Sequence, residues 1–179
     1  MSQPIKWIDV HCHLNMIEKA SADLVQEALD AGVERMVTIG THRADFQSVL
    51  DLAQKHSPQV YCTLGVHPHE AITYDDETEK MILDHVNDPR MVAVAEIGLD
   101  YHYDHSPRDT QQQVFERQLE IAKEHDLPVQ IHTREAEEDT VKILKKFSGQ
   151  VKGLLHCFTS SQWLADEALA LGLNISMSG

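Results

Sequence analysis

The stretch MVAVAEIGLD, residues 91–100, joins a short apolar run to a carboxylate near its end. A run of this length, rich in valine and alanine, is typical of a strand buried on both faces of a parallel sheet. We expect a strand over residues 91–97. Glu96 near its end would be costly to bury unless it were paired or bound to a metal.

Similar apolar runs occur on both sides of this one, with helical spacing between them. We expect strands at residues 8–10, 36–39, 60–64, 127–131, 151–155 and 173–177. We expect helices at residues 21–31, 46–53, 107–125, 140–147 and 162–171, with Ser21 and Ser106 as N-caps of the first and third. This alternation indicates an α/β protein with a parallel sheet, either doubly wound or closed into a barrel.

The positions of the histidines favour the barrel. They lie at or just after strand ends: His11 and His13, His67 and His69, His132, and His156, with Glu96 ending the fourth strand. The carboxyl ends of all barrel strands converge on one site, whereas in an open sheet they are strung out along an edge. The sequence therefore predicts a TIM-type (β/α)8 barrel with one site at its carboxyl face.

Composition excludes several classes of protein. The 179 residues are 42% hydrophobic, enough for one domain, and contain neither an apolar run long enough to span a membrane nor a secretory leader pattern. We therefore expect a cytoplasmic protein with no membrane partner. The formal net charge of −14 argues against a broad basic face that grips duplex DNA.

Three cysteines without a CxxC pair make a disulfide framework or a cysteine-rich zinc site improbable. Because neighbouring side chains on a strand alternate, Cys12 and Cys157 should face packing if the adjoining histidines face the site. We do not expect a nucleophilic cysteine.

The residue types suggest a metal site. His11 and His13 form a His-x-His pair, whose imidazoles share one face of a strand and suit zinc, manganese, iron or nickel. A carboxylate such as Glu96 can bridge two metal ions. The competing interpretations are that the histidines are surface or structural residues, and that Glu96 is paired with Arg134 or Arg35.

Six motifs give a more specific indication. HCHL, GVHPHEA, AEIGLDYHYD, PVQIHTREA, LLHCFTSS and LNISMSG follow one another from about residue 9 to residue 179. In order and spacing they resemble the TatD deoxyribonuclease family. The resemblance implies an incomplete TIM barrel of about seven parallel strands, two divalent ions (Mg, Mn or Zn), and hydrolysis of phosphodiester bonds by metal-activated water.

The resemblance also implies a role for each residue. His11 and His13 match the first pair of metal ligands, Glu96 the bridging ligand, and His132 and His156 the ligands of the second ion. Arg134 matches a contact to the substrate phosphate, His67 a substrate-side histidine, and Asp100 a group that supports the ligands or the substrate. The implied activity is that of a 3′-5′ exonuclease acting on DNA ends or short single-stranded nucleic acid.

The family carries a further metal-ligating aspartate on an eighth strand, and a complete barrel needs about 250 residues. We therefore expect residues 1–179 to form a single barrel domain that lacks the last strand and its helices, with an open edge that permits self-association. Two alternatives to the nuclease remain. One is a small-molecule hydrolase on the same scaffold: the fourth strand, which carries Glu96 and no lysine, disfavours an amidohydrolase but leaves an ester hydrolase open. The other is an inactive metal-binding fragment, which the missing strand favours.

Overall fold

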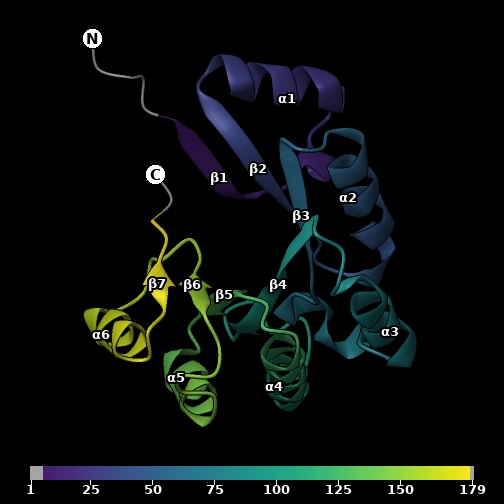
Figure 1. Cartoon of the computed structure of the whole chain (residues 1–179). Coiled ribbons are helices and arrows are strands. Elements are labelled where there is room, and N and C mark those ends of the chain that lie inside the picture. The colour runs from purple at the N-terminus through teal and green to yellow at the C-terminus, as the bar shows by residue number, and fades with distance from the viewer. Residues whose placement is uncertain (1–5, 178–179) are drawn as a thin grey trace.

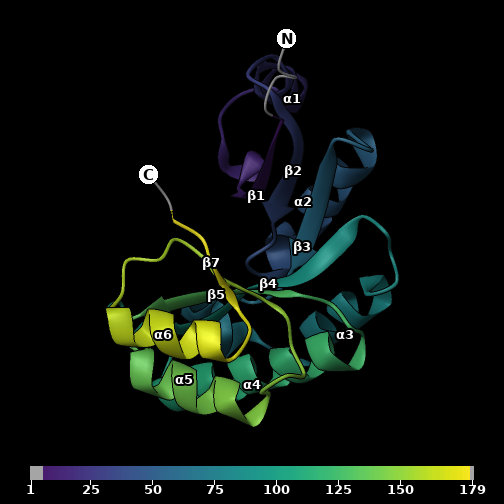
Figure 2. The same cartoon turned by 60° about the vertical axis from the view of Figure 1, so that its left-hand side comes forward.

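The computed structural model describes residues 6–177, which form a curled sheet of seven strands with helices on its outer side (Figures 1 and 2). In chain order the elements are β1 (Trp7–Cys12), η1 (Leu14–Met16), α1 (Ser21–Asp30), β2 (Val33–Ile39), α2 (Arg43–Lys55), β3 (Val60–Leu64), η2 (Pro68–Thr73), α3 (Asp76–His85), β4 (Met91–Asp100), α4 (Arg108–Glu124), β5 (Val129–Arg134), α5 (Glu137–Lys146), β6 (Gly153–Leu155), α6 (Gln162–Ala170) and β7 (Asn174–Ile175).

The strands pair in sequence order from β1 to β7, and every pairing is parallel. Right-handed βαβ connections place the helices on one side of such a sheet. The expected incomplete barrel is therefore confirmed. Among the described residues β1 pairs only with β2, and β7 only with β6, so both outer edges are open.

Two apolar clusters hold the sheet to its helices. The larger lies beneath β3 to β6 and includes Phe46, Phe115, Ile131 and Leu155, all fully buried. The smaller joins η1, α1, β2 and β3 through Leu14, Val25, Met36 and Val60. Full burial of side chains of this size contributes about 1.5–3 kcal/mol each, so these clusters fix the strand positions from the outer side.

Strand β4 carries the residues that decided the fold, and its geometry depends on Gly98. The register with β5 is irregular between Val94 and Ile97 and then aligns Gly98 with His132. Gly98 has φ +137°, and a Cβ atom there would lie 2.0 Å from the carbonyl oxygen of His132. Only glycine permits both this conformation and this close approach of the two strands.

Several local predictions were wrong. Ser21 is the first residue of α1 and not its cap; its hydroxyl contacts His56 Nε2 at 2.9 Å. Helix α4 begins at Arg108, and the Ser106 hydroxyl instead donates to the carbonyl of His69 (2.8 Å). The sequence interpretation also missed α3, which Asp75 caps by accepting the backbone N–H of Thr78.

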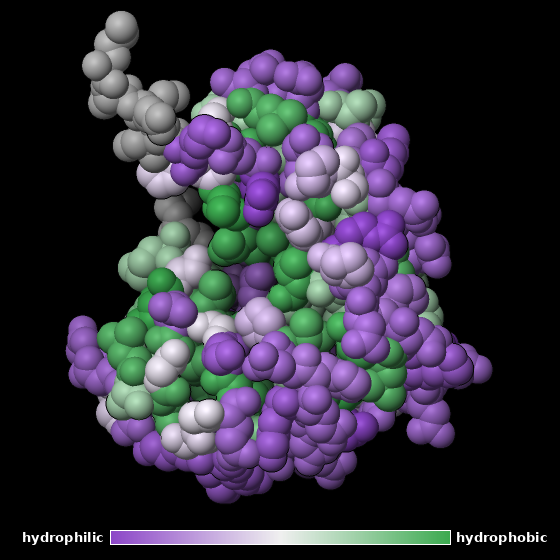
Figure 3. Space-filling view, viewed as in Figure 1, coloured by the Kyte–Doolittle hydropathy of each residue, from purple (hydrophilic) through white to green (hydrophobic). Residues whose placement is uncertain are grey.

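The space-filling view shows apolar side chains flanking a hollow between the two ends of the sheet (Figure 3). A pocket there is lined by residues of β1 and by residues around β6 and β7, including Ile8, Val10, His156 and Met177. None of the described helices has the length and apolar character needed to cross a bilayer.

Candidate metal centre

The predicted site residues all come together at the carboxyl ends of the strands. His11 lies on β1, Glu96 and Asp100 on β4, and His132 on β5. The remaining histidines follow strand ends: His13 after β1, His67 and His69 around the start of η2, and His156 after β6. This convergence is what parallel strands in a curled sheet produce.

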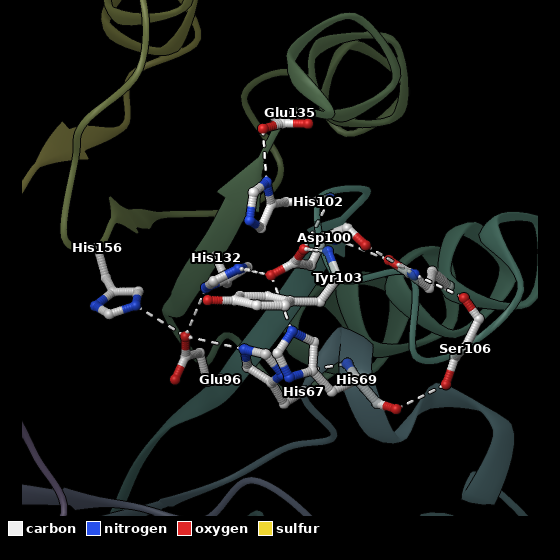
Figure 4. A network of polar contacts seen from close by, with 11 residues as sticks. His67, His69, Glu96, Asp100, His102, Tyr103, Ser106, His132, Glu135 and His156 are labelled. Carbon is white, nitrogen blue, oxygen red and sulfur yellow. Dashed lines mark hydrogen bonds and ion pairs between the residues drawn. The ribbon is translucent and has the colours of Figure 1, made fainter.

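Glu96 lies at the centre of the site and is 4% exposed (Figure 4). Its Oε1 atom lies 2.8 Å from His156 Nε2, 3.1 Å from His132 Nδ1 and 3.5 Å from His67 Nε2, and its Oε2 atom lies 3.5 Å from His11 Nε2. Burial alone would raise its pKa, but the facing imidazoles of His11, His132 and His156 hold the pKa well below its usual value. The alternative pairing of Glu96 with Arg134 or Arg35 is absent from the described residues; Arg35 lies over the ring of Tyr61.

Two sets of potential metal ligands share Glu96. One contains His11, Glu96 and His156, and the other contains His67, Glu96 and His132; within each set the ligand atoms lie within 4.8 Å of one another. A shared carboxylate between two groups of imidazoles is a donor arrangement suited to a pair of divalent ions.

The hydrogen bonds of His11 leave one of its nitrogens available. Nδ1 lies 2.7 Å from Gln130 Oε1, an acceptor, so Nδ1 carries the proton; Gln130 Nε2 in turn donates to the carbonyl of Val10 (2.8 Å). His11 Nε2 is buried and lacks a hydrogen-bond partner within residues 6–177. A buried nitrogen with a free lone pair is costly unless an ion or a donor meets it, so the site fits a metal.

Among the described residues, His13 also has a buried ring nitrogen without a hydrogen-bond partner, but it lies outside both ligand sets. Its Nδ1 is buried without a hydrogen-bond partner in the described part of the chain, and its ring meets that of His11 edge-on at 5.2 Å. The rings of His11 and His156 stack almost parallel, 3.9 Å apart. Burial lowers the pKa of His13, which keeps its imidazole neutral and able to bind metal.

Asp100 orients His132. The carboxylate is fully buried, and its Oδ2 atom accepts from His132 Nε2 (3.0 Å) and from His69 Nε2 (2.9 Å). In the neutral imidazole this pairing holds the proton of His132 on Nε2 and leaves Nδ1, which lies 3.1 Å from Glu96 Oε1, available to a metal ion. Burial raises the pKa of Asp100, but the backbone N–H of Tyr103 and the two imidazoles outweigh it and lower the pKa to about 2.

The charge of Glu96 also acts on its neighbours. Burial lowers the pKa of His11 and of His132, yet the carboxylate of Glu96 outweighs it and raises both pKa values above the ordinary one, with help from Gln130 and Asp100 respectively. His67 is different: burial dominates and lowers its pKa to about 3, so its ring is neutral.

Arg134 and Cys157 lie at the rim. Arg134 forms no ion pair within the described residues, and its guanidinium lies 4.9 Å from the ring centre of Tyr103. Cys157 was expected to face packing, but it is exposed with φ +46°, because β6 ends at Leu155 and strand alternation no longer applies. A pocket of 460 Å³ lies between these residues and the histidines.

Sequence reasoning assigned no role to three residues of this site. Gln130 fixes His11, His69 binds Asp100, and Tyr103 lies beside Arg134. Gln130 did carry a signal, because it is a polar residue within the apolar run that leads to His132, and its position two residues before His132 puts both on one face of the strand.

Comparison with known proteins agrees with this geometry. Residues 8–179 match the family model described as "TatD related DNase". The chain is 37% identical over 175 residues to the "Uncharacterized metal-dependent hydrolase YabD" of Bacillus subtilis, covering 96% of this chain and 68% of that protein. It is 36% identical over 173 residues to the "3'-5' ssDNA/RNA exonuclease TatD" of Erwinia tasmaniensis, covering 96% and 67%.

Among solved structures, the TatD homologue YJJV from Escherichia coli superposes with a TM-score of 0.86 at 32% identity, over 94% of this chain and 66% of that one. A TatD family hydrolase from Entamoeba histolytica superposes with a TM-score of 0.84 at 23% identity, over 98% and 66%, which supports the fold. The chain thus spans about two thirds of the length of these relatives.

Proposed function

Because this chain belongs to the TatD related DNase family of metal-dependent hydrolases, we propose that its site hydrolyses phosphodiester bonds at the 3′ end of single-stranded nucleic acid. The observation that carries the proposal is Glu96, a buried carboxylate shared by two sets of imidazoles. The relatives named as 3′-5′ exonucleases support the substrate class. The match covers about two thirds of the length of those relatives.

We assign two divalent ions to the five predicted ligands. In this assignment Glu96 would be shared by both ions, His11 and His13 would hold the first ion, and His132 and His156 would hold the second. The unmatched nitrogens of His11 and His13 support the first assignment. The short contacts of His132 and His156 with one oxygen of Glu96 support the second. Bound there, Mg, Mn or Zn supplies positive charge to phosphoryl oxygens and acidifies a water molecule.

His67 is assigned to the substrate and not to a metal. Its Nδ1 atom accepts the backbone N–H of His69 (3.2 Å), so the proton of the neutral ring is on Nε2. An Nε2–H group cannot bind a metal, but it can donate to a phosphoryl or leaving-group oxygen. His67 lines the 460 Å³ pocket together with Glu96 and His132, which gives it access to a substrate.

Arg134 is assigned to the phosphate. It lines the same pocket and is exposed, and it makes no ion pair with a described residue. A guanidinium binds two phosphate oxygens at once. With a net charge of −14, the protein has to attract its substrate through such local groups, which fits the end of a single strand better than a long duplex.

Three further assignments belong to the chain as a whole. We propose that residues 1–179 act as one barrel domain in the cytoplasm. We also propose that the chain self-associates through its open β1 edge, where Trp7 and Ile8 are more than half exposed. Sedimentation velocity that shows a single species at every concentration would contradict this last assignment.

The test is Glu96→Gln, which nearly conserves volume but removes the charge that faces both ligand sets. With a 3′-ended single strand and added divalent metal, the release of nucleotides should fall by at least about a hundredfold. Glu138→Gln is the matched control, since Glu138 is exposed on α5 outside the site, and it should keep the wild-type rate.

Blocking the 3′ end should stop release by the wild type, whereas blocking the 5′ end should not. If folded wild-type protein with bound metal releases no nucleotides from either substrate, the proposed function is wrong. If Glu96→Gln retains the wild-type rate, Glu96 is not the bridge.

A further inference from the structure

The turn that follows β4 presents an exposed aromatic side chain beside the metal centre. Tyr103 is 50% exposed, and its ring lies 5.3 Å, edge-on, from the ring of His69. It stacks parallel to His105 at 5.7 Å and carries the guanidinium of Arg134 at 4.9 Å. Figure 4 shows Tyr103 alongside His132 and His67, with its hydroxyl on the side where Glu96 lies. We call Tyr103, His105 and Arg134 the stacking platform.

The backbone under this platform is held by buried polar groups. Asp100 Oδ1 accepts the backbone N–H groups of His102 (3.0 Å) and Tyr103 (2.9 Å), while its Oδ2 atom holds His132. Gln111, fully buried, donates to the carbonyls of Asp100 and Ser106. One carboxylate thus ties the platform directly to a predicted metal ligand, so their separation is fixed.

A second tie connects the platform to the turn after β5. His102 Nδ1 lies 2.7 Å from Glu135 Oε1, and Glu135 follows Arg134. The backbone that carries the platform is therefore held on both sides, although Tyr103 itself is half exposed. Ordering an exposed ring in advance reduces the entropy cost of binding a flat ligand.

The fold itself gives no reason for a tyrosine here. The Tyr103 ring lies outside both apolar clusters, and within residues 6–177 its hydroxyl has no hydrogen-bond partner. An ordered, half-exposed ring with a planar guanidinium beside it matches what nucleobases stack on in proteins that bind single strands.

We infer that the stacking platform binds a nucleobase of the substrate next to the scissile phosphate. This inference rests on the proposed function and adds a base-binding subsite to it. Every base has a π face, so the subsite tolerates any sequence, and stacking holds a nucleic acid without the broad basic surface that this acidic chain lacks. Arg134 lies within the same group, so a base on the platform brings the adjoining phosphate toward its guanidinium.

The test compares four variants of the chain. Tyr103→Leu removes the aromatic face, while Tyr103→Phe and Tyr103→Trp keep it. Tyr61→Leu is the matched control, because Tyr61 also has an arginine over its ring but lies near the amino end of β3, away from the site. Each variant is mixed with short single strands that carry a hydrolysis-resistant phosphorothioate at the 3′-terminal linkage, and binding is measured at equilibrium.

These oligonucleotides differ only at the last or the penultimate nucleotide. The base of that nucleotide is either 2-aminopurine or absent. For wild type, Tyr103→Phe, Tyr103→Trp and Tyr61→Leu, removing one of these bases should weaken binding about tenfold. For Tyr103→Leu, strands with the base should bind about tenfold more weakly, and removing the base should make no further difference. Quenching of 2-aminopurine fluorescence should disappear in Tyr103→Leu alone.

The subsite does not exist if removal of the base weakens binding equally in wild type and in Tyr103→Leu. It also does not exist if removal of the base weakens binding in neither protein. Hydrolysis of bis(p-nitrophenyl) phosphate, which has no base, separates this failure from that of the proposed function. If the protein hydrolyses this compound but its binding of the strands does not depend on Tyr103, the base-binding subsite is contradicted and the proposed function is not. A folded, metal-loaded protein that neither hydrolyses it nor binds the strands contradicts the proposed function.

Discussion

Asp100 belongs to neither set of potential metal ligands, yet it acts on the site in two directions. One oxygen holds the imidazoles of His132 and His69, and the other holds the backbone that carries Tyr103. Carboxylates that hold the second nitrogen of a ligating histidine fix its tautomer and orientation. Asp100 thus supports both a proposed metal ligand and the turn beside it.

We predict that Asp100→Asn lowers metal affinity by about 10- to 100-fold, because the amide no longer polarises His132. The substitution nearly conserves volume, so the chain should remain folded by circular dichroism. Asp104→Asn, at an exposed residue paired with Arg108, is the control and should leave metal affinity unchanged. Equal affinities in wild type and Asp100→Asn, measured by isothermal titration calorimetry, would show that Asp100 does not position a ligand.

The raised pKa values of His11 and His132 predict how metal binding depends on pH. Protons and metal ions compete for imidazole nitrogens, so protonated histidines must release their protons before they bind metal. Because both pKa values lie above the ordinary 6.5, competition should already weaken affinity at a pH above that value. Affinity should therefore rise with pH across neutrality and level off above the raised values.

The proton release itself can be measured. Calorimetric titrations near neutral pH, in buffers with different ionisation enthalpies, should give different apparent binding enthalpies. His13 and His67, whose pKa values are lowered, contribute no protons in this range. Binding that is independent of buffer and of pH would contradict the assignment of His11 and His132 as ligands.

The sequence identified the predicted ligands because histidine and glutamate are conspicuous at the ends of apolar strands. It assigned no role to Gln130, His69 or Tyr103, although His69 stood among the strand-end histidines, since these roles depend on contacts between distant segments. Gln130, for example, meets His11 across 119 positions of sequence. Nor could it show that His11 groups with His156, which the curl of the sheet brings against it.

Among the helices and strands, β4 contributes most to the positions of the site residues. Glu96, Gly98 and Asp100 alternate along it, so the glycine lies between the proposed bridge and the carboxylate that supports His132. The sequence predicted this strand but ended it at residue 97, whereas it continues to Asp100. The extension depends on Gly98, whose close approach to His132 is a tertiary contact that no local pattern encodes.

We predict that Gly98→Ala destabilises the chain by at least about 2 kcal/mol, because the new Cβ would meet the His132 carbonyl in a strained backbone conformation. Gly149→Ala is the control: its φ is +71° but nothing lies within 4 Å of the added atom, so the cost should be about 1 kcal/mol. Urea unfolding measures both. If the two variants are equally stable, close approach of the strands at Gly98 is not what requires glycine.

Other element boundaries show why local patterns are insufficient. Helix α3 was missed although Asp75 precedes an acidic first turn, since the interpretation followed apolar runs and this helix buries only two of its residues, Thr78 and Ile82. Ser106 looked like an N-cap but serves the turn after β3 instead, because its hydroxyl accepts from Ile72 and donates to His69.

At the scale of the whole molecule, strand order and parallel pairing followed from the β/α alternation, and the clustering of polar residues at strand ends selected the barrel. The consequence is a single concave face where five strands contribute to one centre. Helices cover the outer side of the sheet, and the polar residues of the site gather on the concave side. The proposed metal centre requires Glu96 to lie between two ions.

The most direct measurement is a crystal structure of the chain loaded with Mn²⁺, with the ions located by their anomalous scattering. We predict two peaks about 3.5–4 Å apart. One should be bound by His11, His13 and Glu96, and the other by Glu96, His132 and His156. A map with a single peak, or with peaks that do not contact Glu96, would contradict the bridged metal centre.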